Sequence, residues 1–272
     1  MRFAVSLPNF GELGDPSVLV DLAVRAESAG WSGFYLWDHI VLDPGLPFSE
    51  PWVTLGAIAQ ATSRIRIGPM VTPIPRRRPW VVAREVVTLD HLSGGRVDLG
   101  VGIGHPPSTE FGTFGEPEDP RTRANMLEEG LAIIEGILSG ESFEFSGEYY
   151  TVRENRFAPK PVQPRIPIWV ASARLSNRPI RRAARFDGYF PICIDGPFVD
   201  PSALKEDLEY LSLFRDSPIE IILGGPPDPD LIAAYEEVGV TVYMTGPDPF
   251  GTLDQIRADI EQGPPRRSDV LG

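Results

Sequence analysis

The sequence predicts one α/β domain over residues 1–272 that folds as a (β/α)8 TIM barrel. Eight short apolar runs have the length of buried strands, and most are followed directly by a segment with helical periodicity. The length of 272 residues is close to the ~250 typical of one such barrel. Apolar strands that alternate with helices indicate a parallel sheet covered on its outer face. A doubly wound open sheet is the alternative.

The first half of the chain contains four strands. Residues 3–7 form an apolar run stopped by a Pro-Asn pair. Asp15 then supplies an N-cap, Pro16 occupies the first helical position, and Gly30 ends the helix. The same reasoning predicts further strands at 33–37, 65–71 and 97–101, and helices at 51–62 and 80–92.

The second half repeats this rhythm after an insertion of about sixty residues, where other units need roughly thirty. The insertion contains a Pro/Gly-rich loop (105–120), a helix (123–138) and a hairpin (143–152). Strands are then expected at 166–171, 189–194, 219–223 and 240–244, and helices at 177–185, 201–214, 229–238 and 253–262. Long insertions at the top of a barrel usually shape a binding site.

Composition excludes several classes of partner. A formal net charge of −13 argues against nucleic acid and against docking on an anionic membrane. No apolar run approaches the ~20 residues that span a bilayer. Cys193 is the single cysteine, so no intrachain disulfide forms. Met1 runs directly into a strand-like stretch, so we expect no signal peptide and a cytoplasmic protein.

Polar residues at the carboxyl ends of the strands carry the functional signal, because barrel chemistry is located there. Asp38 and His39 follow the second strand, and an imidazole beside a carboxylate suits proton transfer near neutral pH. The alternative is that Asp38 caps a turn and His39 packs beneath the rim. His105 follows the fourth strand and is a weaker candidate of the same kind, in a loop that its Gly and Pro neighbours also explain.

A basic cluster, Arg76 to Arg78, follows the third strand of this acidic chain. On the ligand-binding rim it would hold a phosphate or a carboxylate-rich tail; a solvated charged loop is the alternative. The three histidines are too dispersed for a metal site, so none is expected. The glycine run at residues 100–104 lacks the third-glycine spacing of a dinucleotide fingerprint.

Three stretches carry a family resemblance: "GFYLWDHI", "RIRIGPMVTPIPRRRPWVVAREVVTLDHLSGGRVDLGVGIG" and "STEFGTFGE". They resemble the luciferase-like monooxygenase family, and within it the branch that uses the deazaflavin coenzyme F420. The resemblance is strong over residues 1–135 and looser from "RIPIWVASA" to "FDGYFP". It implies a (β/α)8 barrel of the bacterial luciferase type, which binds FMN or F420 at the carboxyl ends of the strands.

The resemblance also implies roles for residues. Asp38 matches the cofactor-ring contact and His39 the active-site acid or base. A bulge with a non-proline cis peptide, which supports the ring, would fall on Met70-Val71. Thr72 and Gly104 lie beside these positions and are further candidate cofactor contacts.

Two positions depart from the family pattern. His105 stands where several F420 enzymes carry a glutamate. The loop after the fifth strand lacks the glycine-rich phosphate cradle, so we expect Ser172 and Arg174 to make the phosphate contacts. Both departures bear on the choice of cofactor.

The leading hypothesis is an oxidoreductase, expected to be a homodimer, that transfers a hydride between F420 and a small organic substrate. Asp38 and the Met70-Val71 bulge would fix the ring, His39 would exchange a proton, and Arg76 to Arg78 would hold the anionic tail. The nearest alternative is an FMN-dependent monooxygenase that activates oxygen. A non-catalytic flavin-binding protein and an unrelated phosphate-binding isomerase or lyase are alternatives of other classes.

Overall fold

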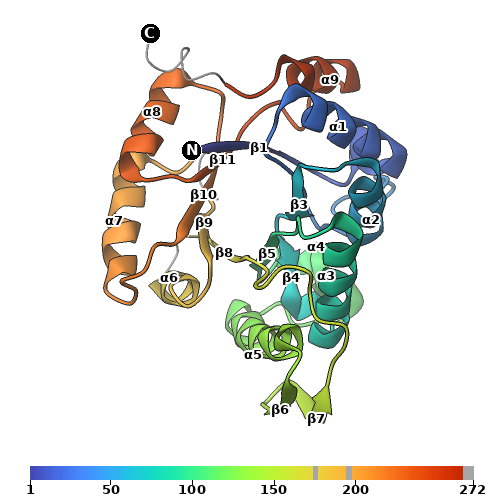
Figure 1. Ribbon diagram of the computed structural model, residues 1–272, viewed down its shortest axis with the longest axis vertical. Helices are drawn as coiled ribbons and strands as arrows, with labels where there is room; N and C mark the ends of the chain where they lie inside the picture. The colour runs from blue at the N-terminus through green and yellow to red at the C-terminus, as the bar shows by residue number, and fades with distance from the viewer. Residues whose placement is uncertain (174–176, 194–197, 266–272) are drawn as a thin grey trace.

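The nine strand segments of the main sheet form a ring surrounded by helices in the computed structural model, which describes residues 1–173, 177–193 and 198–265 (Figure 1). The segments are ordered β3-β2-β1-β11-β10-β9-β8-β5-β4, and every neighbouring pair is parallel. Ile67 of β3 closes the ring by pairing with the segment that leads into β5, because its N–H donates to the Arg96 carbonyl (2.9 Å) and its carbonyl accepts from the Asp98 N–H (3.0 Å). The predicted barrel is therefore confirmed.

The first half follows the predicted order of elements. Its elements are β1 (Arg2–Leu7), η1 (Gly11–Gly14), α1 (Pro16–Ala29), β2 (Gly33–Leu36), α2 (Pro51–Ala61), β3 (Arg66–Pro69), β4 (Thr72–Pro73), η2 (Ile74–Arg76), α3 (Pro79–Ser93) and β5 (Leu99–Gly102). Asp15 caps α1 by accepting from the Ser17 N–H, and Gly30 ends it at φ 92°.

The second half also matches, with three of its four strands shorter than predicted. It contains β8 (Ile168–Ser172), α6 (Asn177–Ala183), β9 (Gly188–Pro191), α7 (Pro201–Ser212), β10 (Glu220–Gly224), α8 (Pro229–Val238), β11 (Val242–Met244) and α9 (Leu253–Gln262). Within the described residues, no helix combines the length and apolar character that a membrane crossing requires.

The third barrel strand is broken, whereas the sequence predicted a continuous strand over 65–71. The break between β3 and β4 contains the Met70–Val71 peptide, which is cis, so the predicted non-proline cis bond is confirmed. β5 packs tightly against the break: a Cβ on Gly100 would lie 2.5 Å from the Pro69 carbonyl oxygen, and one on Gly102 would lie 2.9 Å from Val71 Cγ2. Gly100 and Gly102 therefore allow the two strands to approach closely, because neither has a side chain.

The insertion contains more structure than predicted. The expected loop at 105–120 holds α4 (Pro107–Glu110) and η3 (Gly112–Phe114), and is followed by α5 (Pro120–Ser139) and the hairpin β6 (Ser142–Ser146) and β7 (Thr151–Arg156). The hairpin projects beyond α5 at the bottom of Figure 1. Glu129 of α5 holds the hairpin turn against this helix, because its carboxylate accepts hydrogen bonds from the backbone N–H groups of residues 148–150.

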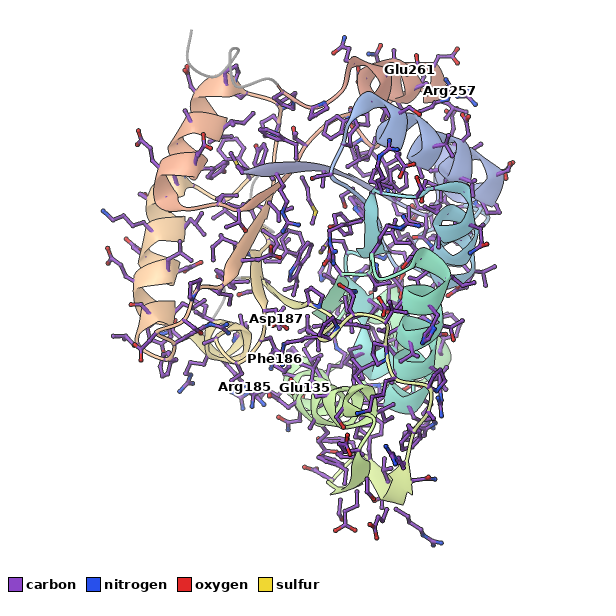
Figure 2. The ribbon with its side chains drawn as sticks, in the orientation of Figure 1. Glu135, Arg185, Phe186, Asp187, Arg257 and Glu261 are labelled. Atoms are coloured by element: carbon purple, nitrogen blue, oxygen red, sulfur yellow. The ribbon has the colours of Figure 1, made fainter. Side chains whose placement is uncertain are left out.

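Ion pairs join the insertion to the second half of the barrel. Arg182 of α6 pairs with Glu128 of α5 at 2.8 Å. Arg165 lies 2.7 Å from Asp187 and 3.6 Å from Glu135, and Figure 2 shows Glu135 and Asp187 where α5 approaches the second half. The insertion is thus anchored on both sides of β8.

The interior of the barrel is an apolar cluster distinct from the shell between sheet and helices. Its buried members are Ala4, Tyr35, Met70, Trp169, Ile222, Val242 and Met244, with Val71 and Phe190 packed partly exposed against them. The strand-break residues Met70 and Val71 therefore belong to the filling of the barrel, and their neighbours at the carboxyl ends of the strands form the floor of the site described next.

Candidate active site

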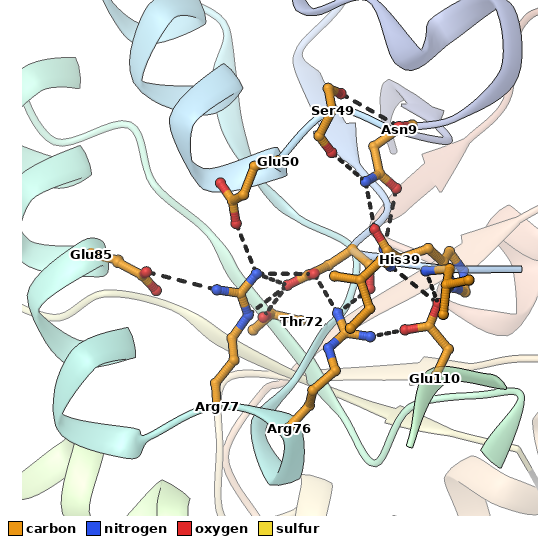
Figure 3. A network of polar contacts seen from close by, with 12 residues as sticks. Asn9, His39, Ser49, Glu50, Thr72, Arg76, Arg77, Glu85 and Glu110 are labelled. Carbon is orange, nitrogen blue, oxygen red and sulfur yellow. Dashed lines mark hydrogen bonds and ion pairs between the residues drawn. The ribbon is translucent and has the colours of Figure 1, made fainter. Parts of the chain in front are cut away.

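Asp38, just beyond β2, is the centre of a buried polar network (Figure 3). Arg76 Nη2 donates to Asp38 Oδ1 at 2.6 Å and to its carbonyl at 2.8 Å. Arg77 Nε donates to Asp38 Oδ2 at 3.1 Å, and the Thr72 hydroxyl donates to the same oxygen. A carboxylate that is 3% exposed requires such partners, because an unpaired buried charge is strongly unfavourable.

Arg76 and Arg77 point inward and are compensated by carboxylates. Arg76 bridges Asp38 and Glu110, both of which are at most 3% exposed. Arg77 Nη2 also donates to Glu50 at 2.9 Å, and its Nη1 lies 3.7 Å from Glu85 (Figure 3). The prediction that these arginines hold an anionic cofactor tail stays a prediction, and this geometry gives them other partners. Arg78, the third member of the cluster, is exposed.

His39 is fixed in position from three directions. The backbone N–H of His39 donates to Asn9 Oδ1 at 3.1 Å. Asn9 Nδ2 donates in turn to the His39 carbonyl at 2.8 Å and to the Ser49 carbonyl at 2.7 Å. The ring lies edge-on to Phe10 and Trp37, with centroids 5.8 and 6.1 Å away. The imidazole therefore has one orientation at the end of β2.

The charge state of His39 follows from burial and from Arg76. Burial and, to a smaller extent, the Arg76 charge together lower the pKa of His39 from 6.5 to about 4, against an opposing effect of Asp38. The imidazole is neutral at pH 7. Its Nδ1 lies 3.1 Å from Glu110 Oε1, and since a carboxylate only accepts, the network assigns the proton to Nδ1. Nε2 is then unprotonated and free to act as a base.

Glu110 is a site residue that the sequence reasoning missed. Its side chain is fully buried, and Oε1 accepts from His39 Nδ1, from the Ile40 N–H (3.1 Å) and from the Val41 N–H (3.2 Å). Oε2 pairs with Arg76. The available signal was the "STEFGTFGE" stretch, which carried the family resemblance without a role for Glu110, the first of its two glutamates. The loop predicted around Glu110 gave no reason to bury a carboxylate.

His105 and Gly104 lie near this site in sequence but have different surroundings. His105 is exposed, and it is Glu110, five positions further on, that contacts His39. Gly104 has φ +81°, and a Cβ there would lie 2.7 Å from the Phe111 ring and 2.9 Å from Pro73. Glycine is thus required at 104 by chain packing. A catalytic role for His105 and a cofactor contact at Gly104 stay predictions.

The carboxyl ends of the strands offer an apolar surface suited to a planar ring. Met70 is 5% exposed, while Val71 and Phe190 are partly exposed above the barrel interior. Thr245, directly after β11, is 6% exposed and its hydroxyl has no partner within the described chain. Apolar side chains and a buried hydroxyl without a partner in the described chain fit a flavin or deazaflavin ring, which has apolar faces and polar edges.

The predicted phosphate contacts after β8 are only partly described. Ser172 is the last residue of β8, is 1% exposed, and pairs in register with Pro191 of β9. Arg174 lies outside the described residues. No group of three or more potential metal ligands occurs in the part of the chain that the structure describes.

The polar network around Asp38 and His39 lies at the carboxyl ends of the barrel strands, where barrel enzymes carry their active sites. Residues 1–200 match the family model described as luciferase-like monooxygenase, and the chain belongs to this family. It is therefore an enzyme of the luciferase-like flavin/F420 oxidoreductase group.

Three individual comparisons agree with this family. An uncharacterised protein of Mycobacterium tuberculosis (strain ATCC 25618 / H37Rv) is 32% identical over 87% of this chain and 89% of its own length. The F420-dependent glucose-6-phosphate dehydrogenase of Nakamurella multipartita is 34% identical over 65% of this chain and 52% of its own length. The structure of an F420-dependent secondary alcohol dehydrogenase in complex with an F420-acetone adduct has the same fold, with a TM-score of 0.78 at 18% identity over 95% of this chain and 97% of that chain.

Proposed function

We propose that this enzyme transfers a hydride between coenzyme F420 and a small organic substrate, with His39 exchanging the accompanying proton. The observation that carries the proposal is the pairing of His39 Nδ1 with Glu110, which leaves Nε2 without a proton. A neutral imidazole whose Nδ1 is occupied by a carboxylate presents Nε2 as its base, as proton abstraction from a substrate requires.

F420, when bound, supplies the hydride acceptor or donor. The strand-break residues Met70 and Val71 would support the ring, and Thr245 offers a hydroxyl to its polar edge. The choice of F420 over FMN is supported by relatives whose names carry F420 dependence. In this proposal Asp38 holds Arg76, Arg77 and Thr72 in place, because all three contact its carboxylate.

The remaining side chains of the network keep the base in its working state. Arg76 contributes a positive charge that lowers the His39 pKa, and Asn9 fixes the His39 backbone. Glu110 lies on α4, so the insertion supplies the group that sets the tautomer of the base. The insertion must therefore be folded for the His39 proton to be held on Nδ1.

Cofactor titrations test the proposal. Purified protein is titrated with F420 and, separately, with FMN, while cofactor fluorescence is followed. Binding of F420 in clear preference to FMN is the expected result. Preference for FMN would overturn the choice of deazaflavin and favour an oxygen-activating monooxygenase.

A histidine substitution tests the catalytic part. His39→Ala is expected to retain cofactor affinity and to lose turnover by roughly 10²- to 10⁴-fold, the usual contribution of a general base. The matched control is His91→Ala, because His91 lies on α3 and contacts the Lys160 carbonyl at 2.8 Å. Unchanged turnover in His39→Ala would remove His39 from the mechanism.

A further inference from the structure

Aromatic side chains from three loops gather beside His39. Phe10 packs against Phe48 with ring centroids 5.4 Å apart and against Trp37 at 6.0 Å. Trp37 meets Phe250 edge-on at 6.3 Å. We call these four residues (Phe10, Trp37, Phe48 and Phe250) the aromatic wall. They follow β1, β2 and β11 or precede α2, so the wall lies at the carboxyl ends of the strands.

The wall is incompletely covered by the protein itself. Phe250 is 72% exposed, Phe10, Trp37 and Phe48 are half-buried, and Ile40 beside His39 is 39% exposed. Apolar surface left open next to a catalytic base is typical of a ligand site, because exposed apolar side chains that gather in one place are unfavourable in water. The side chains that a ligand would cover here are aromatic and uncharged.

The charges around His39 disfavour an anionic ligand. The guanidinium groups that contact this network within the described chain belong to Arg76 and Arg77, and both are paired with carboxylates. Four carboxylates surround these two cations: Asp38, Glu50, Glu85 and Glu110. An acidic substrate would lose its hydration beside an aromatic wall, and neither Arg76 nor Arg77 would be an unpaired cation for it.

We propose that the substrate is an uncharged alcohol or the corresponding carbonyl compound, whose reacting carbon carries an aryl or branched alkyl group that packs on the aromatic wall. This proposal rests on the hydride-transfer function above. In the oxidative direction the hydroxyl proton passes to His39 Nε2 and the carbinol hydrogen passes as a hydride to oxidised deazaflavin. The carbonyl double bond forms as the C–H and O–H bonds break.

Phe250→Ala is the most informative variant. Phe250 is 72% exposed, so its removal leaves the packing of the core unchanged. Losing one aromatic contact costs roughly 0.5–1.5 kcal/mol, which corresponds to a 2- to 12-fold weaker affinity. The matched control is Phe214→Ala. Phe214 is 47% exposed, follows α7 and contacts Tyr210, so its removal leaves the wall intact.

The test measures ligand binding by calorimetry, with and without excess oxidised F420, so that it is independent of turnover. Two matched pairs differ by the exchange of a methyl for a carboxylate: 1-phenylethanol against mandelate, and 4-methyl-2-pentanol against 2-hydroxy-4-methylpentanoate. The neutral member of each pair is expected to bind at least about tenfold tighter. In Phe250→Ala the affinity for the neutral members falls 2- to 12-fold, and in Phe214→Ala it is unchanged.

Equal or tighter binding of the carboxylates would overturn the proposal, as would an absence of binding by both neutral alcohols or an unchanged affinity in Phe250→Ala. The F420 titration separates this from failure of the proposed function. Protein that binds F420 but prefers the acids retains the proposed function and refutes the substrate class. Protein that prefers FMN refutes the cofactor, whichever ligands bind the wall.

Discussion

Glu110 Oε1 lies 3.1 Å from His39 Nδ1, although 71 positions of the chain separate the two residues. This contact connects the insertion to the end of β2, and it determines which imidazole nitrogen remains free. A carboxylate that orients a histidine is a recurrent device for setting the tautomer of a catalytic base.

Glu110→Gln should reduce turnover by roughly 10²-fold while leaving cofactor affinity within a few-fold of the wild-type value. Unlike the carboxylate, the amide can donate as well as accept, so the His39 proton is no longer confined to Nδ1. The measurement is kcat together with the 15N chemical shifts of the His39 ring, which report the tautomer. Glu148→Gln, in the exposed hairpin, is the control. An Nδ1-protonated ring with full activity in Glu110→Gln would show that Glu110 is dispensable.

His39 should make the stability of the protein depend on pH in a defined window. Its pKa is about 4 in the folded protein and 6.5 unperturbed, so between these values the unfolded chain binds the proton and the folded chain does not. The contribution of neutral His39 is therefore complete above pH 6.5 and falls as the pH decreases toward 4. The slope is at most about 1.4 kcal/mol per pH unit.

Denaturant unfolding of wild-type and His39→Gln protein across pH 4 to 8 measures this effect, because the difference between the two curves isolates His39. Glu27 acts in a lower window. Its pKa is lowered from 4.5 to about 2, since hydrogen bonds from the backbone of residues 63–65 outweigh its burial. The stability that Glu27 provides is present above pH 4.5 and is lost below it. Parallel curves for the two proteins between pH 4 and 6.5 would contradict a depressed His39 pKa.

Arg76→Met should destabilise the fold by roughly 3–5 kcal/mol, because it leaves the buried carboxylates of Asp38 and Glu110 without their shared cation. It should also raise the His39 pKa, since the Arg76 charge lowers it. An NMR titration of His39 and a denaturant curve measure the two effects. Arg78→Met is the control, because Arg78 is exposed. A His39 pKa that stays the same or falls in Arg76→Met would refute the electrostatic link.

Arg96→Met should destabilise the protein by roughly 2–5 kcal/mol without weakening cofactor binding. Arg96 is 8% exposed and donates to the carbonyls of Ala59, Thr62, Ile65 and Ser93, which its removal leaves unpaired. The measurement is the free energy of unfolding beside an F420 titration. Arg64→Met, an exposed neighbour of the same region, is the control. Loss of cofactor affinity at full stability would place Arg96 in the site instead.

The barrel could be predicted from the sequence because its signals are local. Asp15, Pro16 and Gly30 bound α1 where expected, and the eight apolar runs fall on the strands of the ring. The break at Met70–Val71 was predicted through the family resemblance, and residue patterns alone had indicated a continuous strand.

The polar network could be predicted only in part. Asp38 and His39 were identified because they follow a strand, but the partners of a side chain depend on distant segments. The sequence predicted an anion site at the arginines after β4, but it could not show that Arg76 contacts Asp38 and Glu110 or that Arg77 contacts Asp38. Glu110 lies in a four-residue helix whose placement against His39 has no local signature.

The most direct test of the central claim is a single-turnover reaction of F420-loaded enzyme with 1-phenylethanol deuterated at the carbinol carbon, in wild-type and His39→Ala protein without oxygen. We predict loss of the absorbance of oxidised deazaflavin, deuterium in the reduced cofactor, and a rate roughly 10²- to 10⁴-fold lower in His39→Ala. Equal rates in the two proteins, or a reaction of the wild-type enzyme that proceeds only when oxygen is present, would contradict hydride transfer assisted by His39.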